Sequence, residues 1–291
     1  MHVTRLLRAR VCGPALVAVL LVLPAGCAAK KGLIPPTTAG EPDRFLFERG
    51  TQLLNQRHWL KSREYFRQLV DNYPQSRYRP DAKLGLGDTY LGEDSTESLV
   101  LGINEFKEFL TFYPTNDRAD YAQLKLALCH YAQMLAPLRD QSQTKEAIKE
   151  FETFVERYPN SHRMAEGAKK LRECKDRLSD ADYQVGYFYY RSRWYPGAIS
   201  RFRAIMKRDP EYTTRDALYY YLADSYVKAH LGAEALPLLD RLVKEFDKSQ
   251  YLERAKRLMV EAQAVGPFVP PGRTVKPAKK GTGQGQDDTG R

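Results

Sequence analysis

Residues that carry chemistry are scarce in this sequence. Its 291 residues include four cysteines and five histidines, and none of them stand at the spacing of a zinc site. The GxSxG, GxxxxGK(S/T) and HExxH patterns of hydrolases, nucleotide-binding proteins and zinc proteases are also missing. We therefore predict that the protein is not an enzyme and holds no metal and no cofactor, apart from a covalent lipid considered below.

The small number of cysteines excludes a disulfide framework. Cys12 lies in the apolar start of the chain and Cys27 at its end, which leaves Cys129 and Cys174 for the folded body. One bridge between these two is conceivable. Both fall within helical patterns, however, which favours two buried free thiols.

Positive charge is in excess but is not concentrated. The formal net charge is +10, and most of it lies in residues 1–42 and 266–291. The body between them is nearly balanced, whereas a nucleic-acid groove needs a concentrated basic stripe. We therefore expect no nucleic-acid partner.

The start of the chain has the pattern of a secretory signal peptide. A basic stretch is followed by an apolar run and by small residues before a cysteine: Arg5, Arg8, Arg10, Val11–Leu23, Ala25, Gly26 and Cys27. The run is too short for a membrane-spanning helix. Residues 1–26 are therefore predicted to be removed.

The end of this run resembles a bacterial lipobox, whose cysteine becomes the lipidated first residue. A lipobox usually has leucine three residues before the cysteine; here Pro24 holds that place and Leu23 precedes it. We predict lipidation of Cys27; the alternative is a secreted protein cleaved near Ala25 that keeps a free thiol. Ala28, rather than aspartate, suggests sorting to the periplasmic face of the outer membrane.

One pattern recurs five times in the body of the chain. A small residue is followed by two bulky apolar residues and a stop: Ser62, Phe66, Leu69, Pro74; Gly102, Phe106, Phe109, Pro114; Ala147, Phe151, Phe154, Pro159; Ala198, Phe202, Ile205, Pro210; and Ala235, Leu239, Leu242, Asp247. The spacing puts three side chains on one helical face, and proline ends the helix. It is typical of the second helix of a tetratricopeptide repeat. We predict an all-α, right-handed superhelical solenoid of five helix-turn-helix repeats.

The composition sets the predicted boundaries. Residues 27–42, which contain four prolines or glycines in their second half, are predicted to be a flexible tether. Residues 43–265 form the solenoid, with stops near 74, 114, 159, 210 and 247. Residues 266–291 are predicted to be a disordered basic tail.

Five local features complete this prediction. The stretch Met164–Arg191 is one long helix or two coaxial helices, and Gln250–Ala264 is a capping helix. To keep the repeat register, the turn Glu93–Thr96 must carry three extra residues and the loop Pro137–Gln143 seven. The Gly85-Leu86-Gly87 segment is predicted to lie at a close helix crossing and not in a phosphate-binding loop.

Nineteen tyrosines offer a candidate binding surface. In a tetratricopeptide repeat, four positions around the small crossing residue of the first helix line the concave groove. In the last two repeats these positions include Tyr183, Tyr187, Tyr190 and Tyr220, which we predict form a peptide-recognition surface. The first repeat places Phe47 and Leu54 there. The alternative is that these side chains only pack the helices together.

The sequence resembles the BamD family of outer-membrane assembly lipoproteins, also called ComL, from about residue 44 to 246. Four segments carry the resemblance: Tyr158-Pro159-Asn160-Ser161, Lys175-Asp176-Arg177-Leu178, Tyr189-Tyr190 and Thr214-Arg215-Asp216-Ala217-Leu218. It implies a non-enzymatic subunit of the β-barrel assembly complex. Such subunits bind the POTRA domains of the barrel protein BamA and unfolded outer-membrane proteins, and other lipoproteins of the complex are further implied partners.

The resemblance implies one contact residue and leaves some departures. Arg201 holds the place of a family arginine near the BamA contact; its alternative is a solvated helix charge. Pro24, the Asp209-Pro210 stop where Tyr-Pro is expected, and the lysine-rich tail depart from the pattern.

The alternative function is a periplasmic repeat adaptor for cell-wall synthesis or envelope constriction. Such adaptors carry a coiled-coil segment, and no heptad run precedes Asp43. A peptidoglycan-acting enzyme would need a catalytic domain for which there is no room.

Overall fold

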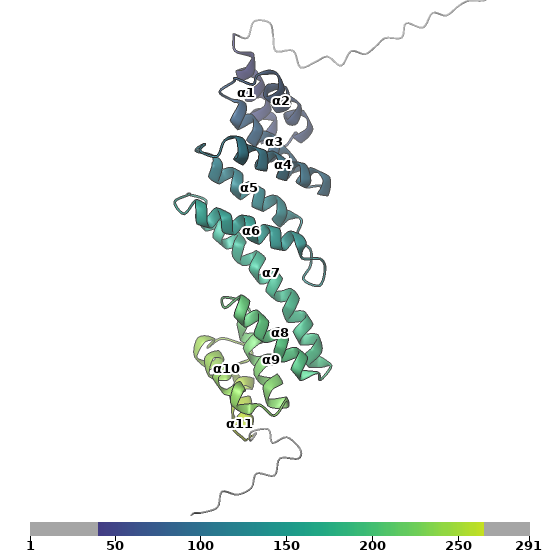
Figure 1. Cartoon of the computed structure of the whole chain (residues 1–291), viewed down its shortest axis with the longest axis vertical. Coiled ribbons are helices and arrows are strands. Elements are labelled where there is room, and N and C mark those ends of the chain that lie inside the picture. The colour runs from purple at the N-terminus through teal and green to yellow at the C-terminus, as the bar shows by residue number, and fades with distance from the viewer. Residues whose placement is uncertain (1–39, 265–291) are drawn as a thin grey trace, which may run out of the picture.

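The computed structural model describes residues 40–264 (Figure 1). These residues form eleven α-helices and no strand: α1 (Pro42–Asn55), α2 (Trp59–Asn72), α3 (Arg79–Glu93), α4 (Thr96–Phe112), α5 (Ala119–Ala132), α6 (Ser142–Arg157), α7 (Met164–Arg191), α8 (Tyr195–Arg208), α9 (Arg215–Lys228), α10 (Gly232–Glu245) and α11 (Leu252–Ala264). The expected signal peptide, the lipid on Cys27, most of the tether and the basic tail lie outside the described residues.

Successive helices pack against one another as five pairs, with α11 against α10, so that the molecule is a long stack (Figure 1). The all-α tetratricopeptide solenoid with a terminal capping helix is therefore confirmed. The first helices of neighbouring pairs also contact each other, α1 with α3, α3 with α5, α7 with α9, and α9 with α11. No contact of similar extent joins successive second helices in the described part, so the first helices form the inner layer.

The repeated small and aromatic residues build the core as predicted. In the second helices the side chains of Phe66, Phe106, Phe151 and Phe202 are fully buried. Two of these rings fit against glycines of α3: a Cβ added to Gly85 would lie 2.5 Å from the Phe66 ring, and one added to Gly87 would lie 2.5 Å from Phe106. The close helix crossing at Gly85-Leu86-Gly87 is thus confirmed.

The extra residues of repeats two and three lie partly in helices and not only in turns. Ser95 and Ser98 form a capping box, with each side chain bonded to the other's backbone amide, so α4 starts at Thr96 and gains a turn of helix. In the third repeat the connection covers residues 133–141, and Ser142 already belongs to α6. Capping chemistry, which the repeat pattern does not contain, sets the start of α4; α6 has no side-chain cap.

A serine links the two ends of three repeats. Ser76, Ser161 and Ser249 each donate a hydrogen bond of 2.5–2.6 Å to an aspartate in the first turn of the same repeat: Asp43, Asp120 and Asp216. Each serine Oγ also accepts a 3.1 Å hydrogen bond from the backbone amide two residues on. This serine clasp explains physically why Tyr158-Pro159-Asn160 is followed by Ser161.

Breaking one clasp should weaken the fold in a pH-dependent manner. Ser161→Ala is expected to lower the free energy of unfolding at pH 7 by about 1.5 kcal/mol, as for hydrogen bonds to charged groups. Burial alone would raise the pKa of Asp120, but the Ser161 hydroxyl, the Tyr121 amide and Arg163 outweigh it and lower that pKa. The clasp therefore contributes above about pH 4, the usual carboxyl pKa, and is lost as the pH falls through the lowered folded-state value.

Urea unfolding at pH 7 and pH 3 measures this difference. Ser142→Ala is the matched control, because Ser142 is exposed and bonds only to Asp140 nearby. An equal loss from Ser161→Ala at both pH values would argue against a role for the ionised carboxylate.

The helix α7 is continuous over 28 residues and joins two sections of the stack. Its first half packs in the cluster that holds Phe151 and Phe154, and its second half packs in the cluster that holds Phe202. Of the two forms that the sequence left open, the structure has the single long helix.

Asp209, which departs from the family pattern, fastens the end of α8 to the middle of α7. Arg172 holds both carboxylate oxygens of Asp209, one at 2.9 Å, and Ser179 donates to it at 2.7 Å. Burial would raise the pKa of Asp209, but these hydrogen bonds outweigh it and lower that pKa. The aromatic that is missing at the stop is supplied three residues later by the fully buried Tyr212, which donates to Asp180 at 2.5 Å.

Candidate functional site

Three tyrosines of α7 form a row along the inner layer. Tyr183, Tyr187 and Tyr190 recur at helical spacing and their rings are stacked, with centroids 6.2 and 6.0 Å apart and planes within 7° and 18°. All three rings are half-buried. The structure thus places the predicted tyrosines of repeat four side by side on one face.

The row continues onto α9 and the start of α11. Tyr221 meets Tyr187 and Tyr190 edge-on, with centroids 4.9 and 5.0 Å apart, and Tyr251 lies 5.7 Å beyond Tyr221. We call the half-buried set Tyr183, Tyr187, Tyr190, Tyr221 and Tyr251 the tyrosine face. It presents aromatic area and hydroxyl groups together, which is the combination found at peptide-binding surfaces.

A polar network closes one end of the tyrosine face. Tyr190 donates to Asp224, and Lys228 donates to the Tyr190 hydroxyl at 2.9 Å and to Asp224 at 2.7 Å. Burial and the Asp224 bond raise the pKa of Tyr190 to about 12. Burial would lower the pKa of Lys228, but its bonds to Asp224 and Tyr190 outweigh it and raise that pKa. At neutral pH this end therefore offers a protonated hydroxyl and an ammonium group.

Sequence reasoning missed two members of the face. The repeat register selected Tyr220, whose side chain is only 7% exposed and belongs to the core. Its neighbour Tyr221 takes the central place, because the inner face of α9 is displaced by one residue from the idealised register. Tyr251 lies in the turn before α11, for which the register defines no position. The aromatic run Tyr219-Tyr220-Tyr221 was the available signal.

The candidates of the first repeat contribute to packing. The Phe47 ring is stacked on Tyr78, with centroids 5.1 Å apart, and it also meets the Phe66 ring. Leu54 packs against the same cluster. Both side chains are half-buried, as the rings of the tyrosine face are, so their place in a binding surface stays a prediction.

Arg201 lies apart from the tyrosine face. It belongs to α8, in the outer layer, and its side chain is exposed. Among residues 40–264 it forms no hydrogen bond or ion pair of its own side chain. Its role at a partner contact stays a prediction.

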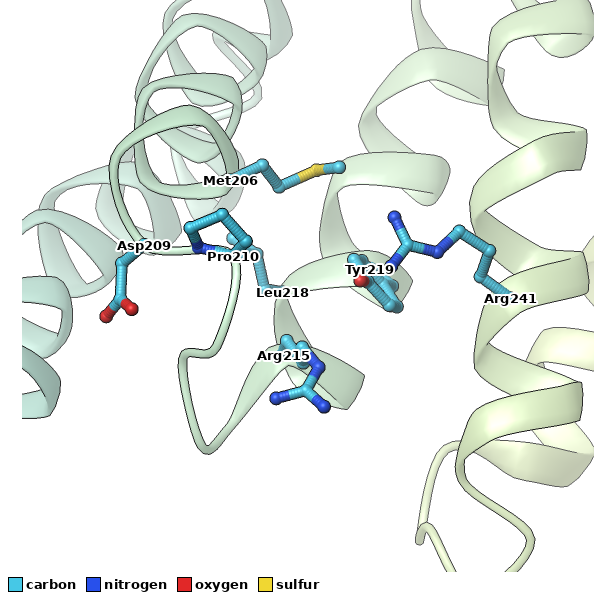
Figure 2. Close-up of a pocket in the computed structure, with 7 residues that line it drawn as sticks. All are labelled: Met206, Asp209, Pro210, Arg215, Leu218, Tyr219 and Arg241. Carbon is cyan, nitrogen blue, oxygen red and sulfur yellow. The ribbon is translucent and has the colours of Figure 1, made fainter. Parts of the chain in front are cut away.

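A small hollow at the end of α8 is not a free anion site, although two arginines line it. Figure 2 shows Arg215 and Arg241 near Tyr219, with Met206, Pro210 and Leu218 around them and the carboxylate of Asp209 turned aside. Glu245 lies 2.9 Å from Arg241 and 4.0 Å from Arg215. Because this carboxylate balances the charges of both arginines, the hollow is part of the packing between repeats.

The two body cysteines are free and buried. The Cys174 Sγ lies 3.5 Å from the Met134 Sδ, and burial raises the pKa of both Cys129 and Cys174 to about 12. The preference for buried free thiols over a bridge is confirmed.

This burial predicts the thiol chemistry. A chain expressed from Ala28 should show no reactive thiol while folded at pH 8, because only about 1 in 10,000 of either thiol would be ionised. Denaturation should release both thiols, and titration with a chromogenic disulfide measures the count. Rapid reaction of Cys129 or Cys174 in the folded chain would contradict the prediction.

In residues 40–264 no three His, Cys, Asp or Glu side chains gather as metal ligands would. None of the helices in that range is both long and apolar enough to cross a membrane.

Comparison with known proteins identifies the family. The model of the YfiO family, described as an outer membrane lipoprotein family, matches residues 40–235. The chain belongs to this family. Several relatives of this chain are named outer membrane protein assembly factor BamD, which confirms the resemblance to the BamD family.

Three such relatives cover most of the chain. The one from Caulobacter vibrioides is 28% identical over 214 residues, which cover 72% of this chain and 68% of the relative. The one from Vibrio cholerae is 26% identical over 64% of this chain and 78% of its own. The one from Rickettsia prowazekii is 26% identical over 86% of this chain and 96% of its own. A solved tetratricopeptide repeat protein from Parabacteroides merdae covers 78% of this chain and 94% of its own, with 14% identity and a TM-score of 0.35.

Proposed function

We propose that this YfiO-family chain is a non-enzymatic scaffold of the machinery that inserts β-barrel proteins into the outer membrane. Family membership carries the proposal, because its relatives are named assembly factors for outer membrane proteins. A lipid on Cys27 would anchor the chain to the periplasmic face of that membrane. The expected partners are the POTRA domains of a BamA-like barrel protein, unfolded outer-membrane proteins and other lipoproteins of the complex.

The two candidate surfaces suit different partners. The tyrosine face lies on the inner layer and offers rings and hydroxyl groups over three helices, which suits an extended segment of an unfolded client. Arg201 lies on the outer layer and is exposed, which suits a contact with a folded domain. A client and a POTRA domain could then be held at the same time.

The identity of the main partner tests the proposal. The chain in its native membrane is crosslinked mildly, captured and analysed by mass spectrometry. A barrel protein with POTRA domains as the dominant partner is the expected result. Recovery of cell-wall enzymes or envelope-constriction proteins instead would replace the proposal with the adaptor function.

The Arg201 contact has a separate test. Arg201→Glu is expected to weaken binding of the POTRA domains about tenfold, since it puts a repulsive charge at the contact. Arg203→Glu, an exposed arginine on another side of α8, is the matched control and should change the affinity little. Unchanged affinity of the Arg201→Glu chain, with helix content intact by circular dichroism, would remove Arg201 from the contact.

A further inference from the structure

The tyrosine face reaches the start of α11, the last described helix. Tyr183, Tyr187, Tyr190, Tyr221 and Tyr251 are all half-buried, so each ring keeps exposed area on the inner layer. The last described helix, α11, begins next to Tyr251 and contacts α9. The chain then continues for 27 residues beyond Ala264.

The length of that continuation fits a crossing of the face. Because successive helices alternate in direction, α7, α9 and α11 run the same way, and Ala264 ends at the same edge as Tyr190 and Lys228. Two helix spacings of about 10 Å each separate α11 from α7, and Tyr190 to Asp180 spans about 15 Å along α7. The diagonal is therefore about 25 Å. The nine residues from Ala264 to Arg273 span about 28 Å as polyproline II.

The residues of this stretch suit an aromatic surface. Its sequence is Gly266-Pro267-Phe268-Val269-Pro270-Pro271-Gly272-Arg273. Proline-rich segments dock on aromatic-lined surfaces, and their backbone carbonyls are free to accept hydrogen bonds. Burial raises the pKa of Tyr183 and Tyr221, so both hydroxyls remain donors at neutral pH.

The charges agree with the same path. Asp180 continues the α7 row at helical spacing below Tyr183 and is half-buried; it accepts a hydrogen bond from Tyr212, whereas Asp176 is already paired with Arg172 at 3.1 Å. A segment that starts at Ala264 and crosses diagonally toward Asp180 brings Arg273 to this carboxylate. The opposite direction would bring its cations to Lys228.

We infer that the proline-rich segment of residues 266–273 binds in extended form across the tyrosine face of its own chain. The short link from Ala264 makes this an intramolecular event with an effective concentration of about 1 mM. A separate peptide that binds with a dissociation constant of about 0.1 mM would then be bound about nine-tenths of the time as part of the chain. The inference requires nothing of the proposed function.

A photoreactive residue in the segment tests this contact. Phe268 is replaced by benzoylphenylalanine in the full-length chain in its membrane, and crosslinked peptides are mapped after irradiation. The expected product is a crosslink within one chain to peptides that contain Tyr183–Tyr190 or Tyr220–Lys228. The same probe at Thr289, near the end of the tail, gives the background.

Two variants make the result decisive. Replacement of Pro267, Pro270 and Pro271 by serine, and separately Tyr187→Ser with Tyr190→Ser, should each lower the crosslink at least about threefold. Circular dichroism of each variant reports whether the helices remain. Three results would overturn the inference. The crosslink from position 268 could be no stronger than the background from position 289, it could join a second copy or another protein, or it could persist undiminished in both variants. The POTRA test would stand in any of these cases.

Discussion

Replacing Arg172 with methionine is expected to lower the free energy of unfolding by about 3 kcal/mol at pH 7. The variant leaves the Asp209 carboxylate, which is 6% exposed, with Ser179 as its main partner. An unpaired buried charge typically costs about 3–5 kcal/mol. The lower end applies, because the Arg172 side chain is 26% exposed. Urea unfolding followed by circular dichroism measures the loss.

The pH dependence and a second substitution identify the cause. Asp209 has a lowered pKa in the folded chain, so the pair stabilises the fold above the usual carboxyl pKa of about 4 and loses that contribution as the pH falls through the folded-state value. The deficit of the variant should therefore be smaller at pH 3 than at pH 7. Adding Asp209→Leu should restore most of the stability at pH 7. A deficit that is the same at pH 3, and unchanged in the double variant, would mean that Arg172 acts by packing alone.

At the crossing of α3 and α4, the effect of Gly87→Ala on the free energy of unfolding should change sign when the Phe106 ring is removed. Phe106→Ala removes a fully buried ring and is expected to cost about 3–5 kcal/mol. Gly87→Ala alone should cost about 1–3 kcal/mol, because its Cβ would lie 2.5 Å from the Phe106 ring. In the Phe106→Ala chain the ring is gone, so Gly87→Ala should instead stabilise by up to about 1 kcal/mol through helix propensity.

Gly85 supplies the matched control on the same helix. Its Cβ would meet the Phe66 ring at 2.5 Å and not Phe106. Gly85→Ala should therefore remain destabilising in the Phe106→Ala chain. If Gly85→Ala and Gly87→Ala changed in the same way, the coupling would lie in the backbone of α3 and not in the two ring contacts.

Residue spacing predicted the fold well because the repeat acts through short-range rules. Ala147, Phe151 and Phe154 share one face of any α-helix, and all three are fully buried in α6. The same rule placed Tyr183, Tyr187 and Tyr190 in one row. What the spacing did not predict depends on contacts between distant residues. Asp209 could replace an aromatic only because Arg172, 37 positions earlier, reaches it.

The candidate site shows the same limit. Tyr221 and Tyr251 join the row through the packing of α9 on α7 and of α11 on α9, which fixes the rotation of each helix within about one residue. A one-residue error turns a helical side chain by about 100° and exchanges a core ring such as Tyr220 for a surface ring. The spacing of the repeat alone does not determine the rotation of a helix to within one residue.

The unbroken α7 also has a mechanical consequence. A helix of 28 residues is about 42 Å long, twice the length of the following helix α8, which has 14 residues. It is a rigid connection between the first three repeats and the last two. Partners bound at its two ends would therefore be kept at a fixed spacing and angle. A partner with two binding sites would gain avidity from this chain only when the separation of its sites matched the length of α7.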